Sequence, residues 1–360
     1  MADSENAKVS VAAKISVLDR YLTLWVLAAM VLGVSIGWLF PGIDSLVKRT
    51  EIDGVSVPIF LGLLAMMYPV FLKVRYERVR PGTIRLSALV LSLVLTWGVG
   101  PLIMYVVAHA MLPDLPHYRT GLILIGIAPC IGMVLVWNML AEGDNELAAV
   151  LVALNSVIQV FFFSVLGWFY LTLLPRWTGG ESAQLQASTW EIAKSVVLFL
   201  GIPLMLGYTT RRIMLRRRGQ SWYEERFLPR IGKIPLAGLL YTIVLTFALQ
   251  GQKIVQLPLD VLRIALPLVT FFFVAFFTAF SIARLLGHPY RENAAIAFTA
   301  SSNNFELAIA VAIAVWGVTS PEALATTVGP LIEIPVLMSL VYVSLWLRRR
   351  FSDDPPEREM

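Results

Sequence analysis

Residues 299–306 read TASSNNFE, and six of these eight side chains are polar. They lie in the middle of an otherwise largely apolar run from 292 to 317, which is long enough to cross a bilayer, since that takes about 20 residues. Polar groups and irregular backbone at that depth are tolerated only where protein lines a cavity. The stretch therefore predicts a membrane helix that is interrupted near its middle.

The composition of the whole chain is that of a membrane protein. Of its 360 residues, 58% are hydrophobic and 15% are charged, against about 25% charged in a typical soluble domain. The mean hydropathy is +0.74, so polar residues are too few to cover a soluble surface. A single cysteine excludes a disulfide-built scaffold.

Ten apolar blocks are long enough to be membrane spans, and they lack the alternation of β-barrel strands. Asp3 and Glu5 stand where a signal peptide would carry basic residues, so no removable signal is expected. The predicted fold is an all-α polytopic membrane protein with ten transmembrane helices, at 22–40, 57–73, 86–111, 120–141, 146–174, 190–215, 232–250, 263–286, 292–317 and 324–347.

Lysine and arginine residues orient these spans. With the amino terminus in the cytoplasm, 22 of the 29 basic residues fall on the cytoplasmic side, in agreement with the positive-inside rule. We therefore predict a multi-pass protein of the cell membrane with cytoplasmic tails at 1–21 and 348–360. The net charge of +5 is explained in the same way, and no nucleic-acid partner is expected.

The ten spans divide into two sets of five, at 22–174 and 190–347, around a polar linker at 175–189 that is predicted to lie outside. Helix starts in the two sets pair at offsets of 168 to 177 residues. Because five is odd, the second set enters the membrane from the opposite side, which is typical of inverted repeats. The spacing thus predicts two inverted five-helix repeats.

Both repeats carry an interruption at the same place. Pro129 lacks a backbone donor and its ring clashes with the preceding turn, so the fourth span is expected to break near 125–129. At an offset of 172 residues, Ala128–Cys130 aligns with Ala300–Ser302 in the ninth span. Broken helices 4 and 9 in matching positions indicate a site at the bilayer midplane. The alternative is a pair of packing kinks filled by neighbouring Ser and Thr side chains.

Two acids lie deep within the last two spans: Glu306 ends the polar octet, and Glu333 lies between two prolines. A charged carboxylate at the bilayer centre costs at least about 2–3 kcal/mol, so such a residue is normally neutral, paired or bound to an ion. We predict a functional role for Glu306. For Glu333, both a functional role and a structural hydrogen bond stay open. Asn155 and Gln159, one turn apart in the fifth span, are more typical of polar contacts between helices.

Cys130 is the only cysteine and follows Pro129 directly. A lone buried cysteine is most often a small apolar side chain, but a thiol at a helix break is also a soft ligand for a metal or metalloid. The sequence leaves both interpretations open. The three histidines, His109, His117 and His288, lie near span ends and are too scattered to suggest a metal cluster.

Residues 33–37 read GVSIG and match the G-x-S-x-G motif of hydrolases. That motif requires a strand, a turn and a helix around the serine, whereas this copy lies within an apolar span. Gly33 and Gly37 are instead expected to let a neighbouring helix approach closely. The sequence contains no phosphate-binding loop and no dinucleotide fingerprint, so neither a cofactor nor ATP-driven transport by this chain alone is expected.

Several stretches together resemble the arsenite efflux permeases of the arsenical-resistance type, which belong to the bile-acid, arsenite and riboflavin transporter superfamily. The stretches are MMYPVFLKVRYE at 66–77, CIGMVLVWNMLAEGD at 130–144, ELAAVLVALNSVIQV at 146–160, FTASSNNFELAIAVAIAV at 298–315 and VGPLIEIPVL at 328–337. The resemblance extends over roughly residues 20 to 350.

The resemblance implies ten helices in two inverted five-helix repeats. It also implies a transporter, not an enzyme, that exports arsenite in exchange for protons, with antimonite as a further candidate cargo. The essential cysteine of the family maps onto Cys130 and its essential glutamate onto Glu306. Many members carry an arginine before the cysteine, where this chain has Pro129, so no role of that arginine is carried over.

Arsenite near neutral pH is mostly the uncharged trihydroxide, so polar side chains can bind its hydroxyls without burying a net charge. One thiol can exchange with a hydroxyl on arsenic and still release it, whereas three thiols would hold arsenic too firmly for turnover. The predicted substrate-binding residues are Cys130, Ser301, Ser302, Asn303 and Asn304, and the predicted proton-coupling residues are Glu306 and Glu333.

Two other functions stay open at this point. A sodium-coupled organic-anion symporter of the same fold would use hard oxygen donors such as Glu306 and the two asparagines beside it. A membrane-embedded enzyme ranks behind it, because the spans contain no recognisable nucleophile and base pair and no set of metal ligands.

Overall fold

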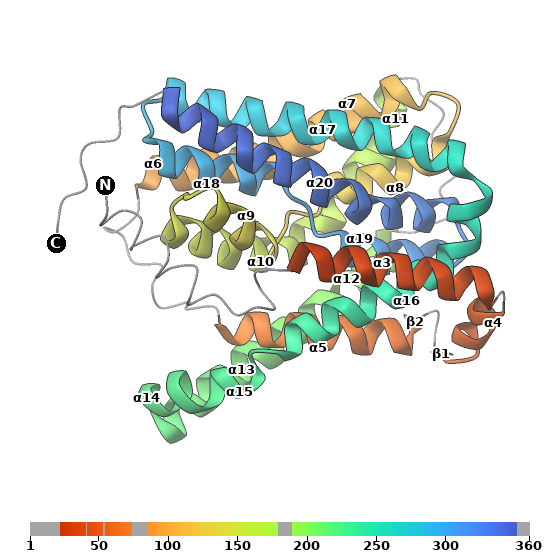
Figure 1. The fold of residues 1–360 in the computed structure, drawn as a ribbon, viewed down its shortest axis with the longest axis horizontal. Coiled ribbons are helices and arrows are strands. Elements are labelled where there is room, and N and C mark those ends of the chain that lie inside the picture. The colour runs from red at the N-terminus through yellow and green to blue at the C-terminus, as the bar shows by residue number, and fades with distance from the viewer. Residues whose placement is uncertain (1–21, 41, 53–54, 74–84, 179–188, 351–360) are drawn as a thin grey trace.

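The chain is described by a computed structural model that covers residues 22–40, 42–52, 55–73, 85–178 and 189–350. It is built almost entirely of helices, with one short hairpin (Figure 1). The predicted amino-terminal tail, most of the predicted linker at 175–189, residues 351–360 of the carboxyl-terminal tail and the basic residues Arg75, Arg78 and Arg80 lie outside the described residues.

The elements carry the labels of Figure 1. In chain order they are α3 (Leu22–Leu39), α4 (Ile43–Lys48), β1 (Glu51–Ile52), β2 (Val55–Ser56), α5 (Val57–Lys73), α6 (Leu86–Val94), η2 (Leu95–Val99), α7 (Gly100–Met111), α8 (Pro116–Gly126), α9 (Val134–Leu140), α10 (Asn145–Trp168), η3 (Phe169–Leu173), α11 (Leu174–Thr178), α12 (Thr189–Val196), η4 (Val197–Gly201), α13 (Ile202–Arg218), α14 (Gln220–Trp222), η5 (Tyr223–Phe227), α15 (Leu228–Ile231), α16 (Ile234–Gln256), α17 (Pro258–Leu285), α18 (Tyr290–Ser301), α19 (Phe305–Trp316) and α20 (Pro321–Arg350).

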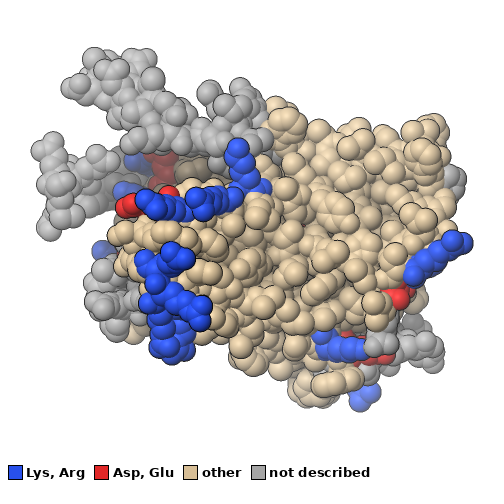
Figure 2. Space-filling view, turned by 90° about the horizontal axis from the view of Figure 1, so that it is seen from below, with Lys and Arg blue, Asp and Glu red and all other residues tan. Residues whose placement is uncertain are grey.

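Six continuous helical segments among the described residues are long and apolar enough to cross a membrane, and three shorter helices are also apolar. Figure 2 shows Lys and Arg side chains gathered towards two ends of the visible face, with a broad uncharged belt between them. Such a belt fits the hydrocarbon layer, since a charged side chain there is costly. The prediction of an all-α polytopic membrane protein is confirmed.

Four of the long segments contain a π-helical turn, and each turn ends shortly before a proline. The turns η2, η3, η4 and η5 precede Pro101, Pro175, Pro203 and Pro229, respectively. A proline ring clashes with the carbonyl one turn before it, and a wider turn relieves the clash while the helix continues. The helical segments therefore continue through these prolines without ending.

The helix α17 begins at Pro258, before the predicted start at 263. Two charged side chains near this start, Asp260 and Arg263, have partners. Tyr118 donates a 2.7 Å hydrogen bond to Asp260, and Arg263 pairs with Asp114. A proline in the first helical turn loses no hydrogen bond, because that turn has no carbonyl before it.

The helix α16 packs closely against α3 through glycines. A Cβ added at Gly33 would lie 2.6 Å from the carbonyl oxygen of Val244 and 2.7 Å from the Cβ of Phe247. In return, a Cβ at Gly251 would lie 2.8 Å from the carbonyl oxygen of Val34. These contacts confirm that the GVSIG stretch serves helix packing, because only glycine allows the backbones to approach this closely.

Two groups of helices surround the predicted interruptions. The helices α3, α5, α13 and α16 form one group, in the lower part of Figure 1, while α7, α8, α17, α18 and α20 pack together in the upper part. Buried aromatic rings hold α17 against the helices on both sides of the ninth-span interruption: Phe276 lies 5.0 Å from Phe298, and Phe272 lies 6.4 Å from Phe305, between ring centroids.

Candidate functional site

The fourth predicted span is interrupted. The helix α8 ends at Gly126 and α9 begins at Val134, so residues 127–133 are not helical. This gap is longer than the expected break at 125–129. Pro129 lies in an isolated β-bridge, and residues 131–133 form bends and a turn just before α9 begins.

The ninth predicted span is interrupted as well, within the polar octet. The helix α18 ends at Ser301 and α19 begins at Phe305. Asn304 caps α19, because its Oδ1 accepts a 3.1 Å hydrogen bond from the backbone N–H of Leu307. Asparagine is among the best residues for this position. The sequence-based prediction of interruptions in both helices is confirmed.

The two interruptions cross and pair as a short antiparallel β-bridge between Pro129 and Asn303. The backbone N–H of Cys130 donates to the carbonyl of Ser302 at 3.0 Å, and that of Asn304 donates to the carbonyl of Ala128 at 2.6 Å. Irregular backbone in a membrane must find partners within the protein. Each interruption therefore supplies hydrogen-bond partners for the other.

Two amide side chains extend this crossing. Gln159 of α10 donates to the carbonyl of Pro129 at 3.2 Å and accepts from the side-chain Nδ2 of Asn304, also at 3.2 Å. Asn303 donates from its Nδ2 to the carbonyl of Ile125 at 2.8 Å. The backbone N–H of Asn303 is directed at Glu333 Oε1, 3.4 Å away.

One acceptor at the crossing has no partner among the described residues, namely the side-chain oxygen Oδ1 of Asn303. Asn303 is only 4% exposed. A buried oxygen without a hydrogen bond costs about 1–3 kcal/mol, and nearly all buried polar groups in proteins are satisfied. This oxygen is covered by protein atoms, so a hydrogen bond to it from a bound molecule would need a small movement of the Asn303 side chain.

A cavity of about 680 Å³ reaches the crossing, and its walls come from α5, α9, α10, α16, α19, α20 and both interruptions. Its inner wall includes the buried Cys130 and Asn303. At the opposite end of the cavity, the lining residues Asn145 and Glu146, at the start of α10, are exposed. The cavity thus connects the buried crossing with the surface near the first turn of α10.

The structure brings five of the seven predicted site residues to this cavity: Cys130, Asn303, Asn304, Glu306 and Glu333. Cys130 and Glu333 are each 5% exposed. A thiol, two amides and two carboxyls therefore share one space.

The other two predicted site residues, both serines, do not line the cavity. Ser301 and Ser302 are buried, but neither lines the cavity. Their hydroxyls donate to the carbonyls of Ala297 and Phe298, one turn earlier in α18. A hydroxyl near the end of a helix readily bonds back to the preceding turn, and this arrangement does not direct it towards the cavity.

Sequence reasoning missed three methionines in the cavity wall, Met66, Met67 and Met133. Met66 and Met67 begin one of the stretches that carry the family resemblance, and that was the only signal for them. Thioethers are soft and polarizable, so they extend the soft character of the Cys130 thiol along the wall. Among the described residues, no three His, Cys, Asp or Glu side chains gather into a group that could hold a metal ion.

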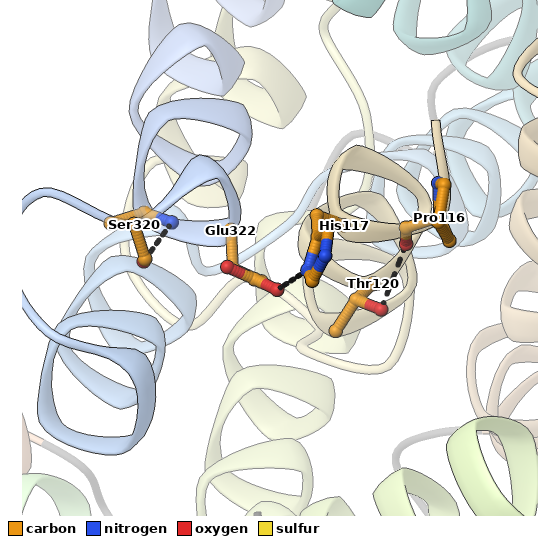
Figure 3. A network of polar contacts seen from close by, with 6 residues as sticks. Pro116, His117, Thr120, Ser320 and Glu322 are labelled. Carbon is orange, nitrogen blue, oxygen red and sulfur yellow. Dashed lines mark hydrogen bonds and ion pairs between the residues drawn. The ribbon is translucent and has the colours of Figure 1, made fainter. Parts of the chain in front are cut away.

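A further buried acid lies away from the cavity, at the start of α20. The side chain of Glu322 is 2% exposed, and its Oε1 lies 2.7 Å from Nδ1 of His117, at the start of α8 (Figure 3). The His117 side chain is 63% exposed. The backbones of these helices also approach closely, since a Cβ added at Gly121 would lie 2.7 Å from the carbonyl of Glu322. This pair joins α8 and α20 at their first turns.

Comparison with known proteins places the chain in a family. Residues 60–257 match the model of the Sodium Bile acid symporter family. The chain is 49% identical to the arsenical-resistance protein Acr3 of Corynebacterium glutamicum, over 95% of this chain and 93% of the relative.

It is also 33% identical to the arsenical-resistance protein Acr3 of Alkaliphilus metalliredigens, over 94% of this chain and 95% of the relative. An uncharacterized transporter of Synechocystis is 33% identical over 95% of this chain and 92% of the relative. The resemblance that the motifs indicated is confirmed. The chain is a transporter, not an enzyme, and belongs to the Acr3 arsenical-resistance proteins within the Sodium Bile acid symporter family.

Proposed function

We propose that this protein exports arsenite from the cytoplasm in exchange for protons. The observation that carries the proposal is that Cys130, Asn303, Asn304 and the two acids Glu306 and Glu333 all line one cavity at the helix crossing. The names of the relatives, which are arsenical-resistance proteins, support arsenic as the element that is carried.

The chemistry of arsenite suits these groups. As the uncharged trihydroxide it has three O–H donors, and the amide and carboxyl side chains of the cavity wall carry acceptor oxygens. The thiol of Cys130 can exchange with a second hydroxyl: an S–As bond forms, an As–O bond breaks, and the thiol proton leaves with the hydroxide as water. No electron is transferred, and a single S–As bond is readily reversed by water.

The direction of transport follows from where the cavity opens. The exposed residues Asn145 and Glu146 lie near Glu142, which pairs with Arg348 at the basic end of α20. We expect this end to be cytoplasmic, because most basic residues are predicted to lie there. The cavity would then receive arsenite from the cytoplasm, as the first step of export requires.

Proton exchange is assigned to Glu306 and Glu333, the two acids in the cavity wall. If arsenite and a proton compete for this space, the site takes up a proton as arsenite leaves to the outside. It releases that proton when the next arsenite binds from the cytoplasm. One alternating cavity then accounts for exchange without a separate proton pathway.

The proposed fold has ten membrane helices in two inverted repeats, as the spacing predicts. The pairing of the two interruptions supports it. They come from matching positions of the two halves and meet in antiparallel orientation at Pro129 and Asn303. Two inverted copies of one element related by a two-fold axis in the membrane plane would meet in this way.

The test is arsenite accumulation in everted membrane vesicles, with and without an imposed proton gradient. We expect accumulation that depends on the gradient and is absent from vesicles without the protein. Sodium-dependent uptake of an organic anion, unaffected by arsenite, would instead favour the symporter alternative. The orientation is tested with a cysteine introduced at position 180, which an impermeant maleimide should label in intact cells.

A further inference from the structure

Gln159 contacts both helix interruptions through a single side chain. It lies in α10 and is fully buried. Its Nε2 donates to the carbonyl of Pro129 in the first interruption, while its Oε1 accepts from Asn304 Nδ2 in the second. The side chain thus uses its donor on one repeat and its acceptor on the other.

Each of these hydrogen bonds acts on a residue next to a predicted functional group. The carbonyl of Pro129 belongs to the peptide group that leads into Cys130, so its position affects where the thiol points. Asn304 caps α19, and Glu306 lies in the first turn of that helix. Gln159 therefore links the backbone beside the thiol to the cap of the helix that carries the acid.

Few groups could replace Gln159. Pro129 lies in an isolated β-bridge at a helix break, where no intrahelical N–H reaches its carbonyl. An apolar side chain at 159 would leave this carbonyl and the Asn304 Nδ2 without the partner that they have now. Buried polar groups that lose a partner tend to move towards another one, and here the movement would shift the crossing.

We propose that Gln159 is a positioning residue for transport: it holds the two interruptions in the register that places Cys130 and Asn303 in the cavity wall. The proposal rests on the proposed function for the identity of the cargo. The arrangement of the thiol, however, can be measured without any cargo.

Asn155 offers a matched control on the same helix. It lies one turn before Gln159 and is also fully buried. Its Oδ1 accepts a 2.9 Å hydrogen bond from Trp97, and within the part of the chain that the structure describes no hydrogen bond joins Asn155 to either interruption. Replacing Asn155 with leucine removes a buried amide of similar size, so it reports the general effect of losing polarity in α10.

The experiment uses the full-length protein purified in detergent. Because Cys130 is the only cysteine, the rate of its modification by a small maleimide reports the exposure and orientation of one thiol. We compare wild type, Gln159→Met and Asn155→Leu for this rate, for arsenite affinity and for melting temperature. Gln159→Met should change the maleimide rate several-fold and weaken arsenite binding about ten-fold.

Asn155→Leu should leave the rate and the affinity close to wild type, even if its melting temperature falls as much as that of Gln159→Met. Equal rates and affinities in wild type and Gln159→Met would overturn the proposal, as would equal changes in the two variants. If wild type binds no arsenite while the maleimide rates behave as expected, the proposed cargo fails and the positioning role stands.

A second variant covers the case in which Gln159→Met does not fold. A neutral carboxyl has one O–H donor and one acceptor oxygen, as the two hydrogen bonds of Gln159 require, whereas an ionised carboxylate has no donor. The affinity of Gln159→Glu relative to wild type should therefore be near one at low pH and fall as pH rises. Glu306, Glu333 and Cys130 titrate in both proteins, so the ratio removes their common contribution and retains the effects of the ionised carboxyl at 159, including its repulsion of these neighbours. A ratio that does not vary with pH would contradict the positioning role.

Discussion

The backbone N–H of Asn304 donates a 2.6 Å hydrogen bond to the carbonyl oxygen of Ala128, and this bond joins the two interrupted helices at their gaps. Together with the bond from Cys130 to Ser302, it satisfies backbone groups that lipid could not. The interruptions are therefore stable only as a pair, and the residues around them are placed by the crossing as a unit.

The first prediction concerns Cys130. Cys130→Ser should insert and fold, because serine is slightly smaller and the buried position tolerates the change in size. It should lose most arsenite export, since a hydroxyl is a poor ligand for a soft centre. The measurement is arsenite accumulation in everted vesicles that contain equal amounts of each protein. Export at the wild-type rate would leave Cys130 as a packing residue and would favour the anion symporter.

The second prediction separates the two cavity acids. Glu306→Gln keeps size and hydrogen bonding but cannot titrate, so it should abolish accumulation driven by a proton gradient while arsenite binding to the purified protein largely persists. Glu333→Gln is the comparison, because it keeps an oxygen that can accept from the backbone N–H of Asn303. If Glu306→Gln still transports under a gradient and Glu333→Gln does not, the proton carrier is Glu333.

The third prediction tests the packing of α3 on α16. Gly33→Ala should destabilise the protein by about 1–3 kcal/mol, the usual effect of forcing extra volume into a packed contact, because the new Cβ would meet the carbonyl of Val244 at 2.6 Å. Gly98→Ala is the control, since nothing lies within 4 Å of its added Cβ. Thermal unfolding in detergent measures both, and a similar melting temperature for the two variants would argue against this packing.

The fourth prediction concerns the pair of His117 and Glu322. His117→Ala leaves a buried carboxylate with its nearest partner removed, so it should be more destabilising than the loss of an exposed side chain. In a double-mutant cycle with Glu322→Leu, the coupling should be about 1 kcal/mol or more. The exposed pair of Arg348 and Glu142 serves as reference, with an expected coupling of about 0–1 kcal/mol. Additive effects of the two changes at His117 and Glu322 would contradict a direct interaction.

Much of the fold could be predicted from the sequence, because few kinds of backbone structure can cross a bilayer. Long apolar blocks predicted the helices, while some ends differ: α17 begins at Pro258, before the predicted 263, and Asp260 in its first turn has a partner in Tyr118. Pro129 and the octet at 299–306 predicted the interruptions, since a missing donor and a cluster of polar groups are local properties of the chain.

The site could be predicted only in part, because hydrogen bonds between residues far apart in sequence decide which polar groups are left without a partner. Ser301 and Asn303 are both polar residues of the octet. The Ser301 hydroxyl bonds within its own helix, whereas Asn303 keeps an unpartnered oxygen among the described residues. Residue type alone does not distinguish them, and neither does it indicate that Gln159 reaches both interruptions.

The sequence by itself determined the membrane class, the helices and the positions of the two breaks. These follow from hydropathy and from the missing N–H of proline, which act within one or two turns of the chain. The tertiary structure alone decided that the breaks pair with each other, that Gln159 of a third helix bonds both, and that soft side chains from α5 face the thiol's cavity. Those contacts join segments far apart in sequence, and only the packing of the helices selects them.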